Sequence, residues 1–217
     1  MLLYYLEGRV ELAVLLSWLI AMAVAITVHE FAHAKSADLA GDPTPRAMGR
    51  LTLNPLAHYD PIGTTMLLFF PFGWAKPVPI NPLAFRHPRR DIIRVSLWGP
   101  LSNFLTAVLL AIPLRLHLAG DYATPLVTII YVNLILAVFN LIPFGPLDGA
   151  HILEGLLSVR ANQRLAAFYQ RNRAWLLILV LIIFVVPAVG SLVFGVILIP
   201  VRLLLWLLVG PGAGMFY

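Results

Sequence analysis

Residues 10–34 of the chain read VELAVLLSWLIAMAVAITVHEFAHA, and this stretch decides the fold class. A helix needs about 20 apolar residues to cross a bilayer, and this stretch is longer than that. Its end carries three ionisable side chains, His29, Glu30 and His33. A removable signal peptide is shorter and has no reason to carry such a cluster. We therefore predict a membrane-spanning helix of the mature protein here.

The composition of the whole chain agrees with this prediction. Of 217 residues, 60% are hydrophobic and only 12% are charged, and the mean hydropathy is +0.89. These values lie outside the range of soluble domains. Further apolar runs cover about residues 92–118, 123–143 and 174–209. We predict an all-α polytopic membrane protein that forms a single domain, 1–217.

The last run, 174–209, is too long for one straight crossing. Pro187 and Gly190 lie inside it, and proline kinks or breaks a helix. The run is therefore predicted to be a helical hairpin that turns near this point or, as the alternative, one kinked helix. We favour the hairpin.

The stretch at about 61–82 is predicted to be a re-entrant or interfacial element. Its first part is apolar but too short to cross the bilayer. Its second part has prolines at alternate positions, Pro77 and Pro79, and proline in sheets is confined to edges. This pattern favours a small membrane-associated β-hairpin or strand.

The basic residues predict the orientation of the chain. The formal net charge is +5, and Lys and Arg gather in cytoplasmic loops of membrane proteins. Here they gather in two loops: Lys35, Arg46, Arg50, Lys76, Arg86, Arg89 and Arg90 before the second run, and Arg160, Arg164, Arg171 and Arg173 after the third. Both loops are therefore expected to be cytoplasmic, with the N-terminus outside. We read the positive charge as topology and predict the lipid bilayer, not nucleic acid, as partner.

The His29-Glu30-Phe31-Ala32-His33 segment predicts a metal site. On a helix, residues four apart share one face, so both imidazoles can reach one ion. Glu30 is then placed to accept a proton from a water molecule at that ion. Zinc in catalytic sites takes three protein ligands, and the chain has no cysteine. A third ligand must be His, Asp or Glu.

Asp148 is the best candidate for this third ligand. The first and third spans run in the same direction, so Asp148, which follows the third, lies at the same end of the membrane as His33. The alternative is an ordinary turn aspartate before Gly149. The competing candidates are His58, His151 and Asp60, of which His58 and Asp60 are also expected to bond loop backbone or cap the next segment.

These motifs resemble the site-2 protease family of intramembrane zinc metalloproteases. Residues 29–33 match its first motif, and Asn140-Leu-Ile-Pro-Phe-Gly-Pro-Leu-Asp148-Gly149 matches its Asn-x-x-Pro-x-x-Pro-x-Asp-Gly motif. Segments 49–63, 73–82 and 99–103 are also similar to compact prokaryotic members without PDZ or CBS domains. For Gly99, Pro100 and Asn103, however, we expect only helix initiation and close packing.

The resemblance implies a role for each matching residue. His29, His33 and Asp148 would bind Zn²⁺, and Glu30 would be general base and then acid. Asn140 would orient or stabilise the tetrahedral intermediate; its alternative is a structural hydrogen bond within the bundle. The first three spans would form a three-helix catalytic core, and 62–82 would help to accept an extended substrate.

The predicted function is intramembrane zinc endopeptidase activity. It would act on transmembrane proteins, in or near their spans, in a prokaryotic cell membrane, with the active site nearer the cytoplasmic face. The alternatives are a membrane metal transporter and a non-catalytic metal-binding scaffold. The sequence predicts nothing about oligomeric state.

Overall fold

The computed structural model describes residues 5–8, 10–69, 73–172, 174–176, 178, 182–183 and 186–210. Its α-helices within these residues are α2 (Leu12–Ala40), α3 (Thr44–Ala47), α4 (Pro61–Phe69), α5 (Pro88–Arg115), α6 (Ala123–Asn140), α7 (Asp148–Leu156), α8 (Val159–Arg171) and α10 (Pro187–Val209). Three short 3₁₀ turns, Pro55–His58, Pro82–Ala84 and Gly120–Tyr122, lie between them.

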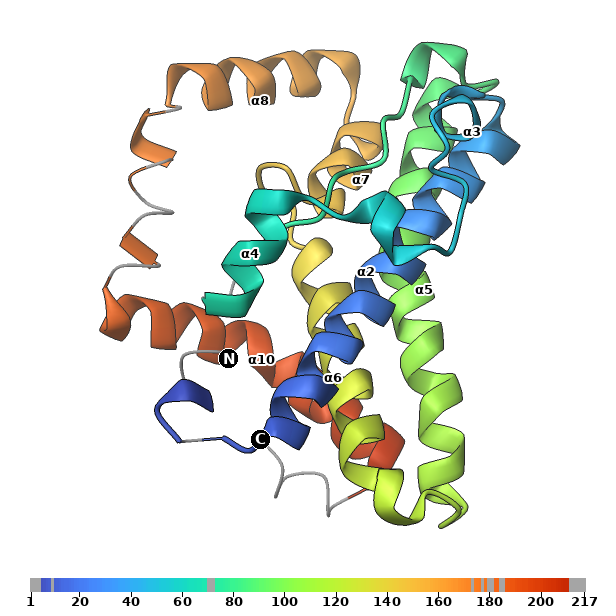
Figure 1. Ribbon diagram of the computed structural model, residues 1–217. Coiled ribbons are helices and arrows are strands. Elements are labelled where there is room, and N and C mark those ends of the chain that lie inside the picture. The colour runs from blue at the N-terminus through green and yellow to red at the C-terminus, as the bar shows by residue number, and fades with distance from the viewer. Residues whose placement is uncertain are drawn as a thin grey trace.

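Helices α2, α5 and α6 form a three-helix bundle, with α10 packed beside it (Figure 1). Helix α2 and helix α6 run in one direction and α5 runs in the other, so the ends of α2 and α6 lie toward the same end of the bundle. The predicted three-helix arrangement is therefore present. It brings residues around 30 and around 145 together.

The ends of two helices follow from local sequence. Helix α2 continues to Ala40 and stops at Gly41, whose φ of 109° is a left-handed conformation that glycine adopts without a steric cost. Helix α5 begins with Pro88 at a position where no backbone donor is needed. Asp91 accepts a hydrogen bond from the backbone N–H of His87 at 2.8 Å, which closes this helix start.

Small residues allow the helices to approach closely. Ala21 and Ala25 of α2 are fully buried and pack with Val132 of α6. A second cluster joins α5, α6 and α10: Ala107, Ala111, Val127, Ile130, Leu134, Val201 and Leu205. Small side chains at helix contacts are typical of packing inside membranes, where dispersion rather than water exclusion holds helices together.

The outward faces of the same helices are strongly apolar. Leu16, Ile20, Leu109, Ile112 and Leu203 are all about half exposed or more. Within the described residues, four helices are long and apolar enough to cross a membrane: Leu12–Ala40, Pro88–Arg115, Gly120–Asn140 and Ala188–Val209. Exposed apolar surface on this scale suits lipid rather than water. The chain is an integral membrane protein.

The predicted β element is wrong for the described residues, which contain no strand. Residues 61–69 form helix α4, and 73–81 is irregular chain. Its N–H groups bond to separate partners: Lys76 N donates to the carbonyl of His58 at 2.9 Å, and Val78 N donates to the Glu30 carboxylate at 3.0 Å. A strand needs a continuous ladder, and the intervening prolines have no N–H to extend one.

The last apolar run contains one described long helix, α10, which begins at Pro187 where a turn or kink was predicted. Several residues between 173 and 185 lie outside the described part, so the choice between hairpin and kinked helix stays a prediction. Pro200 lies inside α10. Arg115, at the end of α5, donates from Nε to the carbonyl of Leu208 at 2.8 Å, which satisfies a carbonyl at the end of α10.

Candidate metal centre and catalytic cleft

Helix α2 presents His29 and His33 toward the interior of the bundle. They are four residues apart and therefore lie on one face, and each is only 6% exposed. Their Nε2 atoms approach to 3.1 Å. Both rings thus point their outer nitrogens at one position.

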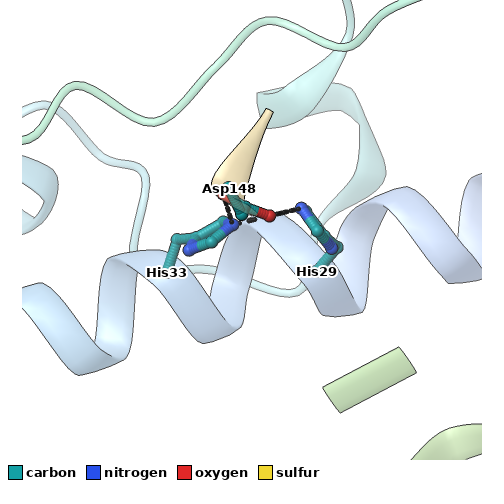
Figure 2. A group of neighbouring side chains, drawn as sticks. All are labelled: His29, His33 and Asp148. Carbon is teal, nitrogen blue, oxygen red and sulfur yellow. Dashed lines mark hydrogen bonds and ion pairs between the residues drawn. The ribbon is translucent and has the colours of Figure 1, made fainter. Parts of the chain in front are cut away.

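Asp148 reaches the same position from the first turn of α7 (Figure 2). Its Oδ2 lies 3.2 Å from His29 Nε2, and its Oδ1 lies 3.2 Å from His33 Nε2. Gly149 makes this approach possible, because a Cβ there would lie 2.4 Å from the carbonyl oxygen of Leu141. The sequence therefore requires glycine directly after the aspartate.

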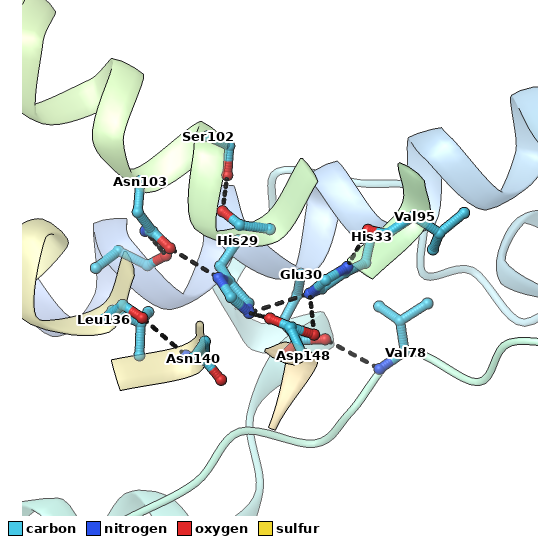
Figure 3. A network of polar contacts seen from close by, with 12 residues as sticks. His29, Glu30, His33, Val78, Val95, Ser102, Asn103, Leu136, Asn140 and Asp148 are labelled. Carbon is cyan, nitrogen blue, oxygen red and sulfur yellow. Dashed lines mark hydrogen bonds and ion pairs between the residues drawn. The ribbon is translucent and has the colours of Figure 1, made fainter. Parts of the chain in front are cut away.

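The inner nitrogens of the two histidines face hydrogen-bond acceptors (Figure 3). His29 Nδ1 lies 2.7 Å from Asn103 Oδ1, and His33 Nδ1 lies 2.8 Å from the carbonyl oxygen of Val95. An oxygen acceptor needs a proton on each Nδ1, which leaves a lone pair on each Nε2 in the neutral ring. Acceptors that bond the inner ring nitrogen in this way orient metal-binding histidines.

The site fits a divalent cation. The Nε2 atoms of the two histidines and the Asp148 carboxylate converge within 4.8 Å. When both Nδ1 atoms carry the ring protons, none of these converging atoms is a hydrogen-bond donor. Asp148 Oδ2 is buried and has no hydrogen-bond partner among the described residues. Leaving such groups unpaired costs free energy, whereas one cation would satisfy all of them. Two imidazoles and one carboxylate are a known catalytic zinc ligand set.

Asp148 is in the ionised form that binding a metal requires. Burial acts to raise the pKa of its carboxyl, but when the Nε2 atoms of His29 and His33 carry protons, their hydrogen bonds and charge outweigh this and lower the pKa to about 2. The carboxylate is therefore charged at neutral pH.

Glu30 lies beside this centre and faces an open cleft. Its Oε2 accepts the hydrogen bond from Val78 N at 3.0 Å, which ties the carboxylate to the 73–81 chain. The cleft has a volume of about 670 Å³ and is lined by Glu30, both histidines, Asp148 and Asn140, among others. A carboxylate beside the metal position and open to a cleft can exchange protons with a bound water or substrate.

Asn140 lies at the end of α6 and also lines the cleft. Its Nδ2 donates to the carbonyl of Leu136, one turn earlier, at 3.0 Å. This bond agrees with the alternative expectation for Asn140, a structural hydrogen bond within the bundle. A carboxamide has two N–H donors, so this bond leaves one for another partner.

The competing candidates lie apart from the three-residue group. His58 is buried and bonds through Nε2 to the carbonyl of Thr52 at 3.0 Å. Asp60 caps α4 by accepting from the N–H of Ile62 and of Gly63. His151 lines the cleft but pairs with Glu154 at 3.1 Å. For His58 and Asp60 the expected loop and capping roles are confirmed.

Gly99 and Asn103 of α5 have more specific roles than the sequence predicted. A Cβ on Gly99 would lie 2.2 Å from His33 Nε2, so only glycine leaves room for the histidines. Asn103 is fully buried and also donates from Nδ2 to the carbonyl of Ala25 and to Asn133 Oδ1. Their spacing of four residues predicts a shared face of α5, but not that this face meets the histidines.

Replacing Asn103 with leucine is expected to weaken zinc binding by about 10- to 100-fold, the usual cost of losing the hydrogen-bond partner of a metal ligand. The cause is the loss of the acceptor for His29 Nδ1, which frees the ring to change tautomer and orientation. Zinc affinity is measured by chelator competition on the purified protein. Ser102→Ala is the matched control, because Ser102 Oγ donates mainly to the carbonyl of Gly99 in its own helix. Equal affinities in the two variants would contradict the role of Asn103.

Comparison with known proteins gives a consistent set of relatives. The profile of peptidase family M50 matches residues 115–186. The chain is 39% identical over 186 residues to "Putative zinc metalloprotease YwhC" of Bacillus subtilis strain 168, covering 80% of this chain and 82% of the relative. It is 31% identical over 193 residues to Rip2 of Mycobacterium tuberculosis H37Rv, which has the same description, covering 85% and 71%.

A more distant relative is archaeal. The zinc metalloprotease MJ0392 of Methanocaldococcus jannaschii is 30% identical over 132 residues, covering 59% of this chain and 38% of the relative. No solved structure gives a significant match.

Proposed function

Because the chain belongs to peptidase family M50, the site-2 protease family of zinc metalloproteases, we propose that it hydrolyses peptide bonds in or beside transmembrane segments of membrane-protein substrates. The observation that carries this proposal is a metal-binding triad with a neighbouring carboxylate, all lining one cleft between membrane-spanning helices. A soluble protease would have no need to place its reacting groups there.

His29, His33 and Asp148 would hold the zinc. When bound, zinc supplies a Lewis acid that polarises the peptide carbonyl and makes water more acidic. Glu30 takes a proton from the attacking water at a carboxylate oxygen as the water oxygen bonds to the carbonyl carbon. It then delivers that proton to the departing amide nitrogen as the C–N bond breaks. Asn140 donates its free N–H to the carbonyl oxygen as negative charge develops there.

The cleft supports an unwound substrate. Helical backbone amides are bonded internally and shielded, so a substrate helix must open before its carbonyl can reach the site. The 73–81 chain, held at Val78 by Glu30, forms one wall of the cleft and lies beside any peptide that enters. The excess of Lys and Arg in the loops at this end supports a cytoplasmic position for the site.

Weakening a substrate helix is therefore expected to increase its cleavage. Two Leu→Gly changes near the cleaved bond lower the cost of unwinding by about 2 kcal/mol, which corresponds to about 30-fold in rate if unwinding limits turnover. Cleavage is measured on tagged single-span peptides reconstituted with the full-length protein in liposomes.

The matched control carries the same two glycines at the far end of the span and is expected to be cleaved at the original rate. Equal rates for all three peptides would contradict substrate unwinding in the cleft. Zinc flux across the liposome without cleavage of any peptide would contradict the proposed function itself.

A further inference from the structure

Helix α8 (Val159–Arg171) separates basic and apolar side chains on two neighbouring stripes. Arg160, Arg164 and Arg171 share one face by their spacing of four and seven residues. Beside them runs an apolar stripe, composed of Ala161, Leu165, Phe168 and Tyr169. A helix with this pattern is typical of those that lie in a membrane surface.

The burial of α8 differs from that of the spans. None of its residues is buried, and Phe168 is 54% exposed. Tyr169 touches Phe144, with ring centroids 6.3 Å apart, so the protein covers only part of the apolar stripe. The rest needs another apolar environment.

The position of α8 supplies that environment. Figure 1 shows it beyond α7, on the side of the molecule where α2 and α6 end, extending away from the bundle and transverse to α2, α5 and α6. Because those helices cross the membrane, a helix that runs transverse to them at one end is oriented along the membrane surface. Its apolar stripe can then enter the lipid while its arginines stay among the headgroups.

A hollow beside the arginines could receive a headgroup. It has a volume of about 610 Å³ and is lined by Leu157, Ser158, Arg160, Ala161, Arg164 and Leu165. No ion pair joins either arginine to an acid within the described part of the chain. Leu157 also lines the catalytic cleft, together with Val159 and Asn162. The hollow therefore adjoins the cleft.

We propose that α8 is an interfacial helix and that Arg160 and Arg164 bind the headgroup phosphate of an anionic phospholipid beside the catalytic cleft. Arginine binds phosphate through two parallel hydrogen bonds, and two such groups one turn apart suit a single phosphate. An acidic segment of a protein substrate could also meet these charges, but it would leave the adjacent apolar stripe unexplained. This inference rests on the membrane-spanning assignment and not on the proposed proteolysis.

The first test compares lipid retention. Full-length protein is purified in detergent with equal amounts of phosphatidylglycerol and phosphatidylcholine of the same acyl chains, and retained lipids are counted by native mass spectrometry. Wild type is expected to retain phosphatidylglycerol preferentially. The Arg160→Gln/Arg164→Gln variant is expected to lose this preference by about tenfold or more, since each basic residue at a membrane surface contributes substantially to anionic-lipid binding.

The matched control is Arg86→Gln/Arg90→Gln, which removes the same charge from exposed positions just before α5 and in its first turn. It is expected to retain phosphatidylglycerol as wild type does. Equal losses in the two variants, or no preference in wild type, would overturn the site. An unchanged preference in the α8 variant, with a raised KM only for substrates that carry acidic flanks, would overturn it in favour of substrate recognition.

The second test measures the depth of α8 and does not depend on lipid affinity. Because the chain has no cysteine, Phe168→Cys and Gln163→Cys each give one site for a nitroxide label in the reconstituted protein. The label at 168 is expected to be accessible to oxygen and shielded from a water-soluble nickel reagent, and the label at 163 is expected to show the reverse. Equal access of the nickel reagent to both positions would contradict an interfacial α8.

Discussion

Replacing Glu30 with glutamine is expected to abolish proteolysis while zinc stays bound at about one ion per chain. Glutamine has nearly the same shape and retains an oxygen that can accept from Val78 N, which now bonds to Glu30 Oε2. It cannot accept a proton from water at neutral pH. Loss of a general base reduces rates by about 10²- to 10⁴-fold, and here the same group also protonates the leaving nitrogen. Cleavage is measured in liposomes and zinc by elemental analysis.

The matched control for this variant is Glu154→Gln. Glu154 also lines the cleft, but it lies in α7 and pairs with His151 rather than with the three-residue group. Its replacement is expected to change the rate by no more than a few-fold. Activity of Glu30→Gln within a few-fold of wild type would exclude Glu30 as base.

Replacing Asp148 with asparagine is expected to remove zinc. The substitution keeps the size of the side chain but replaces a charged ligand with a neutral amide, and it leaves two histidines alone at the centre. Loss of a residue that only hydrogen-bonds a ligand weakens zinc binding by about 10- to 100-fold. Loss of a ligand itself should therefore weaken zinc binding by more than about 100-fold. Activity should fall in proportion to zinc occupancy at limiting metal.

Asp121→Asn provides the control, because Asp121 is exposed in the short connection before α6, at the other end of the bundle. Circular dichroism establishes that both variants remain helical. Unchanged zinc affinity in Asp148→Asn would mean that the third ligand is another group, and the convergence of Asp148 with the two histidines would then need another explanation.

The sequence predicted those parts of the site that depend on local geometry and span direction. The spacing of His29 and His33 predicted a shared helix face, and the alternation of spans predicted that Asp148 would lie at the same end. The predicted ends of the spans were less accurate, because an apolar run indicates which residues lie in lipid and not where the helix itself ends. Helix α2 continues beyond residue 34 to Ala40, until Gly41 stops it.

Features that depend on packing between helices were missed. The contacts of Gly99 and Asn103 with the histidines depend on the rotation of α5 against α2, which no local pattern specifies. The prediction of a β element was wrong for a related reason. Alternate prolines indicate extended chain, but a strand also needs a partner, and the N–H of Val78 bonds instead to a side chain of α2.

In the proposed mechanism, His29, His33 and Asp148 hold the zinc and Glu30 transfers the proton when a membrane-embedded peptide bond is cleaved. Its most direct test is to measure zinc per chain and peptide cleavage in the same liposomes for wild type, Glu30→Gln and Asp148→Asn. We expect zinc with cleavage in wild type, zinc without cleavage in Glu30→Gln, and neither in Asp148→Asn. Full zinc and cleavage in either variant would contradict it.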